Sequence, residues 1–580
     1  MPRRGGAVHV TTTSRHYTGK DGKEKVYQSV LLRRSYRQDG KVRNETLANL
    51  SHLPGPAIDA IRAVLDGKDL IEAGAGVAVL RSLPHGDAAA AHAAARRLGF
   101  PAILGPACPE RDLAYALIVS RVIRPASKLA TISWWQDSTL GADLGVTGAS
   151  TDDAYGAMDW LHERQDAIEG ELARRHLSEG GMALFDLSSS WMEGSHCDLA
   201  ARGYSRDGKR GRPQIEYGLL TDPAGRPVAI RVFAGNTADP AAFTEAVRTV
   251  REDFGLDKLV MVGDRGMITS ARIAALKDDT ALGWVTALRG PAIRKLAAAG
   301  GPLQMTLFDD QDLAEITSPD YPGERLIACR NPFLAAERAR KRQALLAATE
   351  AELAKVAARV TAGRLRDPDK IGLRAGRVAN KYKVAKHLAL VIGEGAITWT
   401  RDQAKIDAEA ALDGIYIIRT PVPAETLDAP GAVAAYKSLA YVERDFRSVK
   451  SDDLDLRPVF HRLDERVRAH VLICMLACYL TWHLRKAWAP LTYTDEGPPA
   501  RHNPVAPARR SAAAARKASR RAGDNGQPLH SYQGLLGHLA TLTRNIIRAG
   551  TATFDQLSVP APAQQRAFEL IGAPIPLTLQ

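Results

Sequence analysis

The chain has 580 residues, of which 45% are hydrophobic, and a formal net charge of +13 at pH 7. This length allows about three to four domains, and the positive charge favours a polyanionic partner, nucleic acid before membrane. The five cysteines are scattered and odd in number, so they predict no disulfide framework and fit a reducing cytoplasm. The N-terminus lacks the apolar core of a signal peptide, and the most apolar run, 469–480, is too short to span a bilayer, so we expect no membrane partner.

The first segment, residues 1–105, is predicted to be basic and rich in strands. Its alternating stretches 8–16 and 26–33 are separated by a glycine- and lysine-rich turn, which favours a hairpin. A helix and a linker are expected from the Gly/Ala-rich stretch near residue 75 to about residue 105. The segment either recognises DNA ends or is a simple basic sheet, and the sequence leaves both open. Its clustered cations are Arg33, Arg34, Arg37, Lys41 and Arg43.

Residues 106–180 are predicted to be helical, and residues 181–490 to form an α/β domain. Candidate helix N-caps stand at Ser127 and at 151–153. In the α/β part, a strand that starts at Met182 is followed by two strands around a Pro/Gly turn, and then by helix, strand, helix and strand. The ranges expected for these six later elements are 215–220, 228–233, 240–254, 259–262, 269–279 and 284–288.

A long insertion, from about 291 to 410, is expected to interrupt this domain. Its helix at 333–362 is rich in Ala, Arg, Lys and Glu, which is typical of a solvated or coiled helix. A strand at 415–419 and a helix at 461–488 complete the domain. Residues 491–528 are predicted to be a disordered basic linker, because they are rich in Pro, Ala and Gly and carry seven Arg and Lys but no acid between Arg501 and Arg521. A short helix at 529–548 is expected in the tail, 529–580.

Two carboxylates stand in or at the end of apolar strands, which is a costly position for an acid. Asp186 lies within MALFDLSSS, and Asp264 directly follows KLVMVG. A buried carboxylate needs a metal or a partner charge to offset its lost hydration. Together with Glu443, which lies on a later amphipathic helix, these acids would form an all-oxygen site of the kind that Mg²⁺ prefers.

The helix around Glu443 is predicted to have a buried stripe and, beside it, a charged row. The stripe consists of Ala435, Leu439, Val442, Phe446 and Val449, at spacings of 4, 3, 4 and 3 residues. The row consists of Tyr436, Glu443, Arg447 and Lys450. An acid followed by cations one and two turns later suits a metal beside a phosphate backbone, but it also suits an ordinary solvated flank with a Glu–Arg pair. The helix alone leaves both interpretations open.

These motifs resemble those of the insertion-sequence DDE transposases that carry a Tyr-Arg-Glu-Lys signature. In that signature Tyr is followed by two residues and Arg, three residues and Glu, and six residues and Lys. Tyr436, Glu443 and Lys450 match it, whereas Leu439 stands where the Arg is expected. FDLSSS and VGDRGM resemble the two Asp motifs of the family, and residues 211–239 resemble the hairpin between them. The resemblance extends over about residues 180–490.

The resemblance implies a ribonuclease H-like mixed sheet, and the predicted order of strands and helices matches that layout. It also implies that Asp186, Asp264 and Glu443 are catalytic and hold two Mg²⁺ ions, which Mn²⁺ would replace, and that Tyr436, Arg447 and Lys450 bind DNA. Arg447 is a candidate to replace the missing Arg. The expected substrates are double-stranded DNA at the element's terminal repeats and at a target, cut by a homodimer. The alternatives are a ribonuclease H-like nuclease that does not transpose and an inactive DNA-binding regulator.

Overall fold

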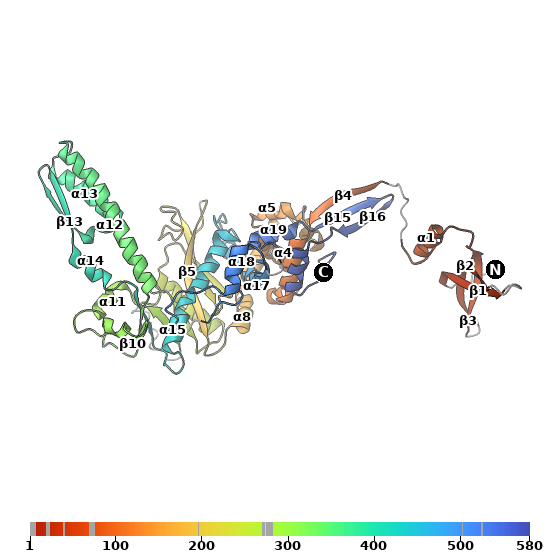
Figure 1. Cartoon of the computed structure of the whole chain (residues 1–580), viewed down its shortest axis with the longest axis horizontal. Coiled ribbons are helices and arrows are strands. Elements are labelled where there is room, and N and C mark those ends of the chain that lie inside the picture. Colours follow the sequence, from red (N-terminus) through yellow and green to blue (C-terminus); the bar gives the residue numbers. More distant parts are fainter. Residues whose placement is uncertain are drawn as a thin grey trace. The chain divides into compact units, whose positions relative to one another are not determined.

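The computed structural model describes residues 7–18, 24–38, 41–68, 76–194, 196–269, 273, 282–500, 503–523 and 526–579 (Figure 1). The chain divides into two compact units. The smaller unit combines Met1–Leu83 with Thr543–Val559, and the larger unit combines Pro84–Leu542 with Pro560–Gln580.

The smaller unit contains two three-stranded sheets. The first is antiparallel in chain order, β1 (Ala7–Thr18), β2 (Glu24–Gln38) and β3 (Lys41–Asn49), and is followed by helix α1 (Gly55–Leu65). This confirms the strands expected at 8–16 and 26–33. In the second sheet β15 (Thr543–Ala549) lies between β4 (Val77–Pro84) and β16 (Ala552–Leu557). Strand β4 replaces part of the helix-and-linker stretch expected before residue 105.

The β15–β16 hairpin also corrects the helix expected at 529–548. The helix there, α19 (Tyr532–Ala540), ends before residue 543, and the chain then becomes extended. The β-branched residues Thr543, Ile546 and Ile547 favour strand over helix. Gly550 adopts a φ of 61°, which allows a two-residue turn between the paired residues Ala549 and Ala552.

Seven helices precede the main sheet, two in the helix-and-linker stretch expected to end near residue 105 and five in the region 106–180 expected to be helical. They are α2 (Gly86–Arg97), α3 (Phe100–Leu104), α4 (Pro109–Ile123), α5 (Lys128–Trp135), α6 (Thr139–Asp143), α7 (Thr151–Glu163) and α8 (Gln165–His176). Ser127 caps α5, as expected, because its hydroxyl accepts the backbone N–H of Ala130. The cap of α7 is Ser150 rather than 151–153. Ser150 and Asp153 bond to each other's backbone N–H groups in a capping box.

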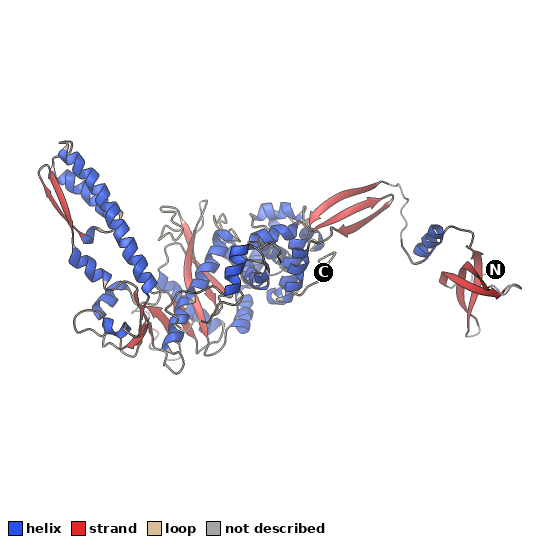
Figure 2. Ribbon diagram, viewed as in Figure 1, coloured by secondary structure: helices blue, strands red, loops and turns tan. Residues whose placement is uncertain are grey.

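The larger unit is built on an eight-stranded mixed sheet (Figure 2). Its first five strands in the chain are β5 (Met182–Trp191), β6 (Gln214–Thr221), β7 (Pro227–Ala234), β8 (Val260–Gly263) and β9 (Gly283–Ala287). They lie in the order β7-β6-β5-β8-β9, in which β5, β8 and β9 are parallel and β6 is antiparallel to its neighbours. This is the ribonuclease H-like arrangement. Helix α9 (Asp239–Arg248) continues as a π-helical turn to Asp253, and the helix expected at 269–279 lies almost wholly outside the described residues.

The insertion expected at 291–410 has two parts. Its first part, which includes α11 (Gly290–Leu296), contributes β10 (Leu313–Ile316) and β11 (Arg325–Arg330), and these join the main sheet through β14 (Ile415–Thr420). Its second part is an arm of α12 (Pro332–Thr361), α13 (Pro368–Lys381), β12 (Leu388–Gly393), β13 (Ala396–Arg401) and α14 (Gln403–Ala410). The arm has a separate buried core that includes Leu346, Leu353 and Ile371.

The helix predicted around Glu443 is three consecutive segments. Helix α15 (Ala429–Lys437) ends at Ser438, α16 (Leu439–Arg447) carries Glu443, and a π-helical turn covers Ser448–Asp452. The predicted stripe of Ala435, Leu439, Val442, Phe446 and Val449 is buried throughout. The apolar periodicity therefore predicted the buried face correctly but not the interruption of the helix.

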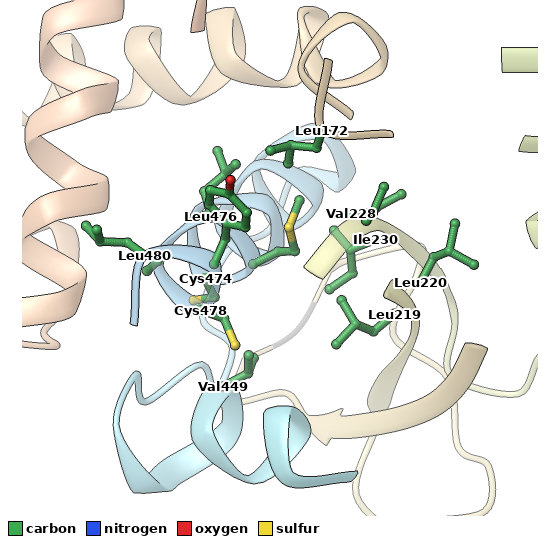
Figure 3. Packing of buried hydrophobic residues seen from close by; sticks show 14 of the residues in the cluster. Leu172, Leu219, Leu220, Val228, Ile230, Val449, Cys474, Leu476, Cys478 and Leu480 are labelled. Carbon is green, nitrogen blue, oxygen red and sulfur yellow. The ribbon is translucent and has the colours of Figure 1, made fainter. Parts of the chain in front are cut away.

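Helix α17 (Asp464–Ala487) is a core helix in which 15 of 24 residues are buried. Figure 3 shows its residues Cys474, Leu476, Cys478 and Leu480 among apolar side chains of α8, β6 and β7. In the described part of the chain α17 alone is long and apolar enough to cross a membrane, and 83% of its most apolar window is buried inside the protein. The run 469–480 was expected to be too short to span a bilayer, but the helix that contains it has 24 residues. Its burial accounts for its apolar composition.

Residues 491–528, expected to be a disordered linker, pack against the larger unit in their described part. Helix α18 (Ala512–Arg520) is capped by Ser511, and Lys517 on its buried face donates to the carbonyl of Ala489 at 3.1 Å. The Asn503 amide donates to Asp312 at 2.7 Å. Composition alone did not predict this packing, because it depends on the specific partners of Lys517 and Asn503. Helix α20 (Pro562–Leu570) completes the described elements.

Candidate active site

Asp186 and Asp264 lie side by side because of how β5 and β8 pair. The two strands are parallel, and Phe185 pairs with Gly263 at the end of the ladder. The next residue of each strand is therefore Asp186, inside β5, and Asp264, just beyond β8. Asp186 is half-buried between β6 and β8, whereas Asp264 is exposed at the end of its strand. Carboxyl ends of parallel strands are the usual place for ligand sites in such sheets.

Glu443 comes to the same region because α16 packs against β5. The Phe446 ring meets the Tyr217 ring edge-on, with 5.7 Å between centroids. Tyr217 pairs with Ser188, and Ser188 shares a sheet face with Asp186, since side chains alternate along a strand. The buried stripe of α16 thus lies over this face, and Glu443, one turn before Phe446, is exposed at its edge.

The three acids act on one another electrostatically. Burial is the largest cause that raises the pKa of Asp186 to about 7, and the negative charges of Asp264 and Glu443 raise it further. The backbone N–H of Leu187 and the charge of Arg206 lower it in part. Asp186 is thus held where burial and two like charges oppose its ionisation, a pattern typical of functional carboxylates.

This crowding of carboxylates fits a hard divalent cation. The donors are all carboxylate oxygens, as Mg²⁺ and Mn²⁺ prefer, and a cation would offset the repulsion at Asp186. In the ranges that the structure describes, no three His, Cys, Asp or Glu side chains are already placed to hold one ion together. The fit therefore concerns donor chemistry and charge, not a preformed coordination shell.

Of the other predicted residues, Tyr436 is the one that contacts a site carboxylate. From the last turn of α15 its hydroxyl donates to Oδ1 of Asp264 at 3.1 Å. Burial and the charge of Asp264 raise the pKa of this phenol, so it stays a donor at neutral pH. Arg447 is exposed at the end of α16. The predicted row is therefore not a continuous helix flank, because Tyr436 lies before the break at Ser438.

Lys450 lies in a buried ion pair instead of on an exposed flank. Its side chain is 10% exposed, and Nζ donates to Oδ1 of Asp207 at 2.8 Å; the same oxygen also accepts from Arg457. Burial lowers the pKa of Lys450, which the hydrogen bond to Asp207 partly offsets. The π-helical turn after α16 places Lys450 here, which a count along a regular helix does not foresee.

A second set of charged groups near the acids was not predicted. The Arg206 guanidinium donates to Glu216 at 3.1 Å and to Asp239 at 2.6 Å, while its backbone N–H donates to the hydroxyl of Ser189. Burial raises the pKa of Glu216 to about 7. Carboxylate oxygens of Asp239 and Asp264 both approach Gly266, at 3.4 and 3.7 Å from where a Cβ would stand. An acid inside the apolar strand QIEYGLL is the signal that could have identified Glu216.

Comparison with known proteins was made with families, curated proteins and solved structures. Residues 17–74 match the IS1634 family transposase N-terminal domain, and residues 188–480 match the transposase DDE domain, which contains Asp264 and Glu443 and begins two residues after Asp186. No curated protein matches the chain.

Among solved structures, a piggyBac transposase synaptic complex with hairpin DNA is similar at 8% identity. The similarity covers 74% of this chain and 70% of that chain, with a TM-score of 0.34. The DDE domain match spans half of the 580 residues, and the match to an insertion-sequence N-terminal domain precedes it in the chain. The chain therefore belongs to the insertion-sequence DDE transposases.

Proposed function

We propose that this transposase cuts double-stranded DNA at the terminal repeats of its own mobile element and joins the freed ends to target DNA. Asp186, Asp264 and Glu443 are the proposed catalytic residues. The observation that carries this proposal is that three acids from distant parts of the chain are brought to one region, because the register of β5 and β8 sets Asp186 beside Asp264 and α16, which carries Glu443, packs against β5. A homodimer is the proposed active form because two element ends must be cut together, and the DNA substrate places its action in the cytoplasm.

We infer that two Mg²⁺ ions, for which Mn²⁺ would substitute, are held by the three carboxylates. Transposase DDE domains are generally dependent on divalent metals. When bound, such ions supply an activated water and neutralise the charge that develops on the leaving oxygen. The same geometry serves both cleavage by water and attack by a freed 3′-hydroxyl, so the proposal requires no covalent enzyme intermediate.

The neighbouring residues would position the acids and the DNA. Tyr436 restricts Asp264 by donating to its Oδ1, and it lies close enough to the site to contact a phosphate. Arg447, exposed one turn after Glu443, would bind a phosphate of the cut strand. Lys450 was predicted to do the same, but its pair with Asp207 supports a role in holding the loop that follows β5 against the π-helical turn.

The test is cleavage of DNA that carries the element's ends, with Asp186→Asn, Asp264→Asn and Glu443→Gln. Each change should reduce cleavage at least about 100-fold, since even indirect partners of a metal contribute about 10–100-fold. Binding to the same DNA without divalent metal should remain within a few-fold. Asp198→Asn is the matched control, because this exposed acid lies in the loop after β5, outside the proposed site. Near wild-type cleavage by any of the three variants would remove that residue from the proposed site.

A further inference from the structure

A cavity of about 940 Å³ lies on the larger unit, away from the three carboxylates. It is formed by the end of α4, the start of α5, α7 and the segment 455–470. The cations that line it are Arg121, Lys128, Arg457, Arg462 and Arg466. Asp455 is the single acid among the described lining residues. A lining of this composition favours an anionic ligand.

Lys128 is the most unusual of these cations because it is buried without an acid. Its side chain is 5% exposed, and Nζ lies 3.1 Å from Nδ1 of His470. Nε2 of His470 lies 3.2 Å from the carbonyl oxygen of Leu456 and must donate to it, so Nδ1 accepts from Lys128. Among the described residues no carboxylate pairs with Lys128. Burial and the nearby charge of Arg121 lower its pKa to about 7. A buried ammonium with a neutral partner is costly unless a ligand supplies the counter-charge.

The remaining charges do not neutralise the cavity. Arg466 pairs with Asp159, and Arg457 shares Asp207 with Lys450, so acids outside the lining offset part of the charge of these two arginines. Arg121, Lys128 and Arg462 are left to face Asp455 alone. Arg121 donates to the carbonyl of Leu454 at 3.4 Å, which holds its guanidinium beside the cavity. Cationic groups therefore outnumber the acids that face the cavity, which favours an anionic ligand.

Exposed apolar surface stands next to these cations. The side chains of Phe460, Leu129 and Leu463 are 64%, 67% and 53% exposed, and all three line the cavity. Tyr155 lies deeper and is covered by Arg466 at 4.5 Å from its ring centroid. Aromatic and apolar side chains beside cations bind nucleobases by stacking while the cations bind phosphate. The volume is also of the size that holds a small organic ligand rather than an inorganic ion.

The wall of the cavity is bonded to the strand that carries Asp186. The backbone N–H of Val459 donates to the carbonyl of Trp191 at 3.2 Å, and Arg457 covers the Trp191 ring at 5.1 Å. Trp191 is the last residue of β5, five residues after Asp186, which is about 16 Å along a strand. A DNA strand held at Asp186 would reach the cavity within a few nucleotides.

We propose that this cavity binds one nucleotide of a DNA strand, with the phosphate on Lys128 and Arg121 and the base against Phe460. It would hold DNA that leaves the carboxylate site. That the ligand is DNA rests on the proposed function, whereas the preference of the cavity for a nucleotide rests on the residues that line it. Inorganic phosphate is also an anion, so the experiment must distinguish it from the phosphate group of a nucleotide.

The test measures binding of a 5′-phosphorylated tetranucleotide to the full-length protein without divalent metal, so that no cleavage occurs. Lys128→Met should weaken binding at least 10-fold, and the unliganded variant should unfold at or above the wild-type temperature, because an unpaired buried charge is removed. Arg462→Gln, at the exposed rim, should weaken binding a few-fold. Lys370→Met, an exposed lysine on α13, is the control and should bind like wild type. The tetranucleotide should raise the thermal midpoint of the wild type more than inorganic phosphate at equal concentration.

Three outcomes would overturn the proposal. Equal affinity in the wild type, Lys128→Met and Arg462→Gln would show that the cavity does not bind the strand. A lowered midpoint in Lys128→Met with no effect of Arg462→Gln would make Lys128 a structural residue. Equal stabilisation by inorganic phosphate would exclude a nucleotide site. None of these measurements depends on Asp186, Asp264 or Glu443. Loss of cleavage in the variants of these acids and loss of binding in the variants of the cavity are therefore independent results.

Discussion

At Asp87 the effect of burial on the pKa is larger than the opposing effect of the helix N-terminus. The carboxylate stands in the first turn of α2, where the helix dipole favours an anion, and accepts the backbone N–H of Ala88 at 2.8 Å. Its residue is nonetheless 6% exposed, and burial raises its pKa to about 6 despite these hydrogen bonds. The folded protein therefore holds a proton on Asp87 at pH values where the unfolded chain has lost it.

This shift predicts a pH-dependent stability difference for Asp87→Asn. Between pH 4 and 6 the folded state binds more protons at this group than the unfolded state, so wild-type stability falls as pH rises through this window. The variant lacks this loss, so its free energy of unfolding should rise by up to about 3 kcal/mol relative to that of the wild type between pH 4 and 7. Thermal midpoints of the wild type and of Asp87→Asn across this pH range measure the difference. Asp153→Asn is the control of opposite sign, because hydrogen bonds from Ser150 lower the pKa of that exposed acid. If the stability difference from the wild type changed with pH in the same way for Asp87→Asn and for Asp153→Asn, the raised pKa would not belong to Asp87.

An acid within or at the end of an apolar strand was the signal that singled out two candidate residues. Asp186 and Asp264 were proposed in this way, and the register of β5 and β8 brings them to the same level. Glu216 carries the same signal but was overlooked, and its partner Arg206 lies in a loop that follows no periodic pattern. The pair of Lys450 with Asp207 joins residues 243 positions apart. No local spacing predicts such a contact, because it is fixed by tertiary packing.

At the scale of elements, the change from α16 to a π-helical turn at Ser448 separates two cations that the sequence placed on one row. Arg447 stays on an exposed surface of α16, whereas the π-helical turn carries Lys450 inward to Asp207. The two residues should therefore respond differently to the same substitution.

Arg447→Gln should leave the thermal midpoint unchanged and reduce the slope of log affinity against log salt by about 0.9, the value for one phosphate contact. Lys450→Gln should leave the slope unchanged and cost about 1–3 kcal/mol of stability, because Asp207 would lose a buried partner. DNA titrations at several salt concentrations and thermal unfolding of both variants decide it. A reduced slope with an unchanged midpoint in Lys450→Gln would restore its predicted contact with DNA.

Elements with a clear period were predicted to within a few residues. The strands at 215–220 and 228–233 and the helices at 333–362 and 461–488 all exist with small changes of boundary. Elements that depend on distant partners were missed. Strand β4 is extended because β15 pairs with it, and β10 and β11 are short strands that gain their place from β14. Pattern alone cannot supply these partners, since pairing over hundreds of residues is decided by the whole fold.

At the scale of the whole molecule, some of the cationic side chains face the interior of the protein, whereas others are exposed to solvent. In α18 Lys517 and Ala514 face the protein, while the arginines of the same segment face solvent. The exposed cations of this segment include Arg509, Arg510, Arg516 and Arg520. The segment thus combines a packed side with a basic surface, a combination suited to nonspecific contact with DNA.

Changing these four arginines to Gln should lower the salt slope of DNA binding by up to about 3.6, at about 0.9 per phosphate contact, without lowering the thermal midpoint. Deleting residues 500–522 should instead lower the midpoint, because the contacts of Asn503 and Lys517 would be lost. Fluorescence anisotropy over a salt series and thermal unfolding distinguish the two changes. An unchanged slope in the fourfold variant would show that this surface does not touch DNA.

The sheet of β4, β15 and β16 has a consequence for synthesis. β4 ends at Pro84, and its partner β15 begins at Thr543, so the ribosome adds more than four hundred residues between them. At about 5–20 residues per second this takes roughly half a minute to a minute and a half. During that time the backbone edge of β4 that later pairs with β15 stays open, and the strand also carries Val77, Val79 and Leu80, which are exposed even in the finished sheet. A nascent chain that stalls before residue 543 keeps this edge open, so protection against mispairing depends on completing translation.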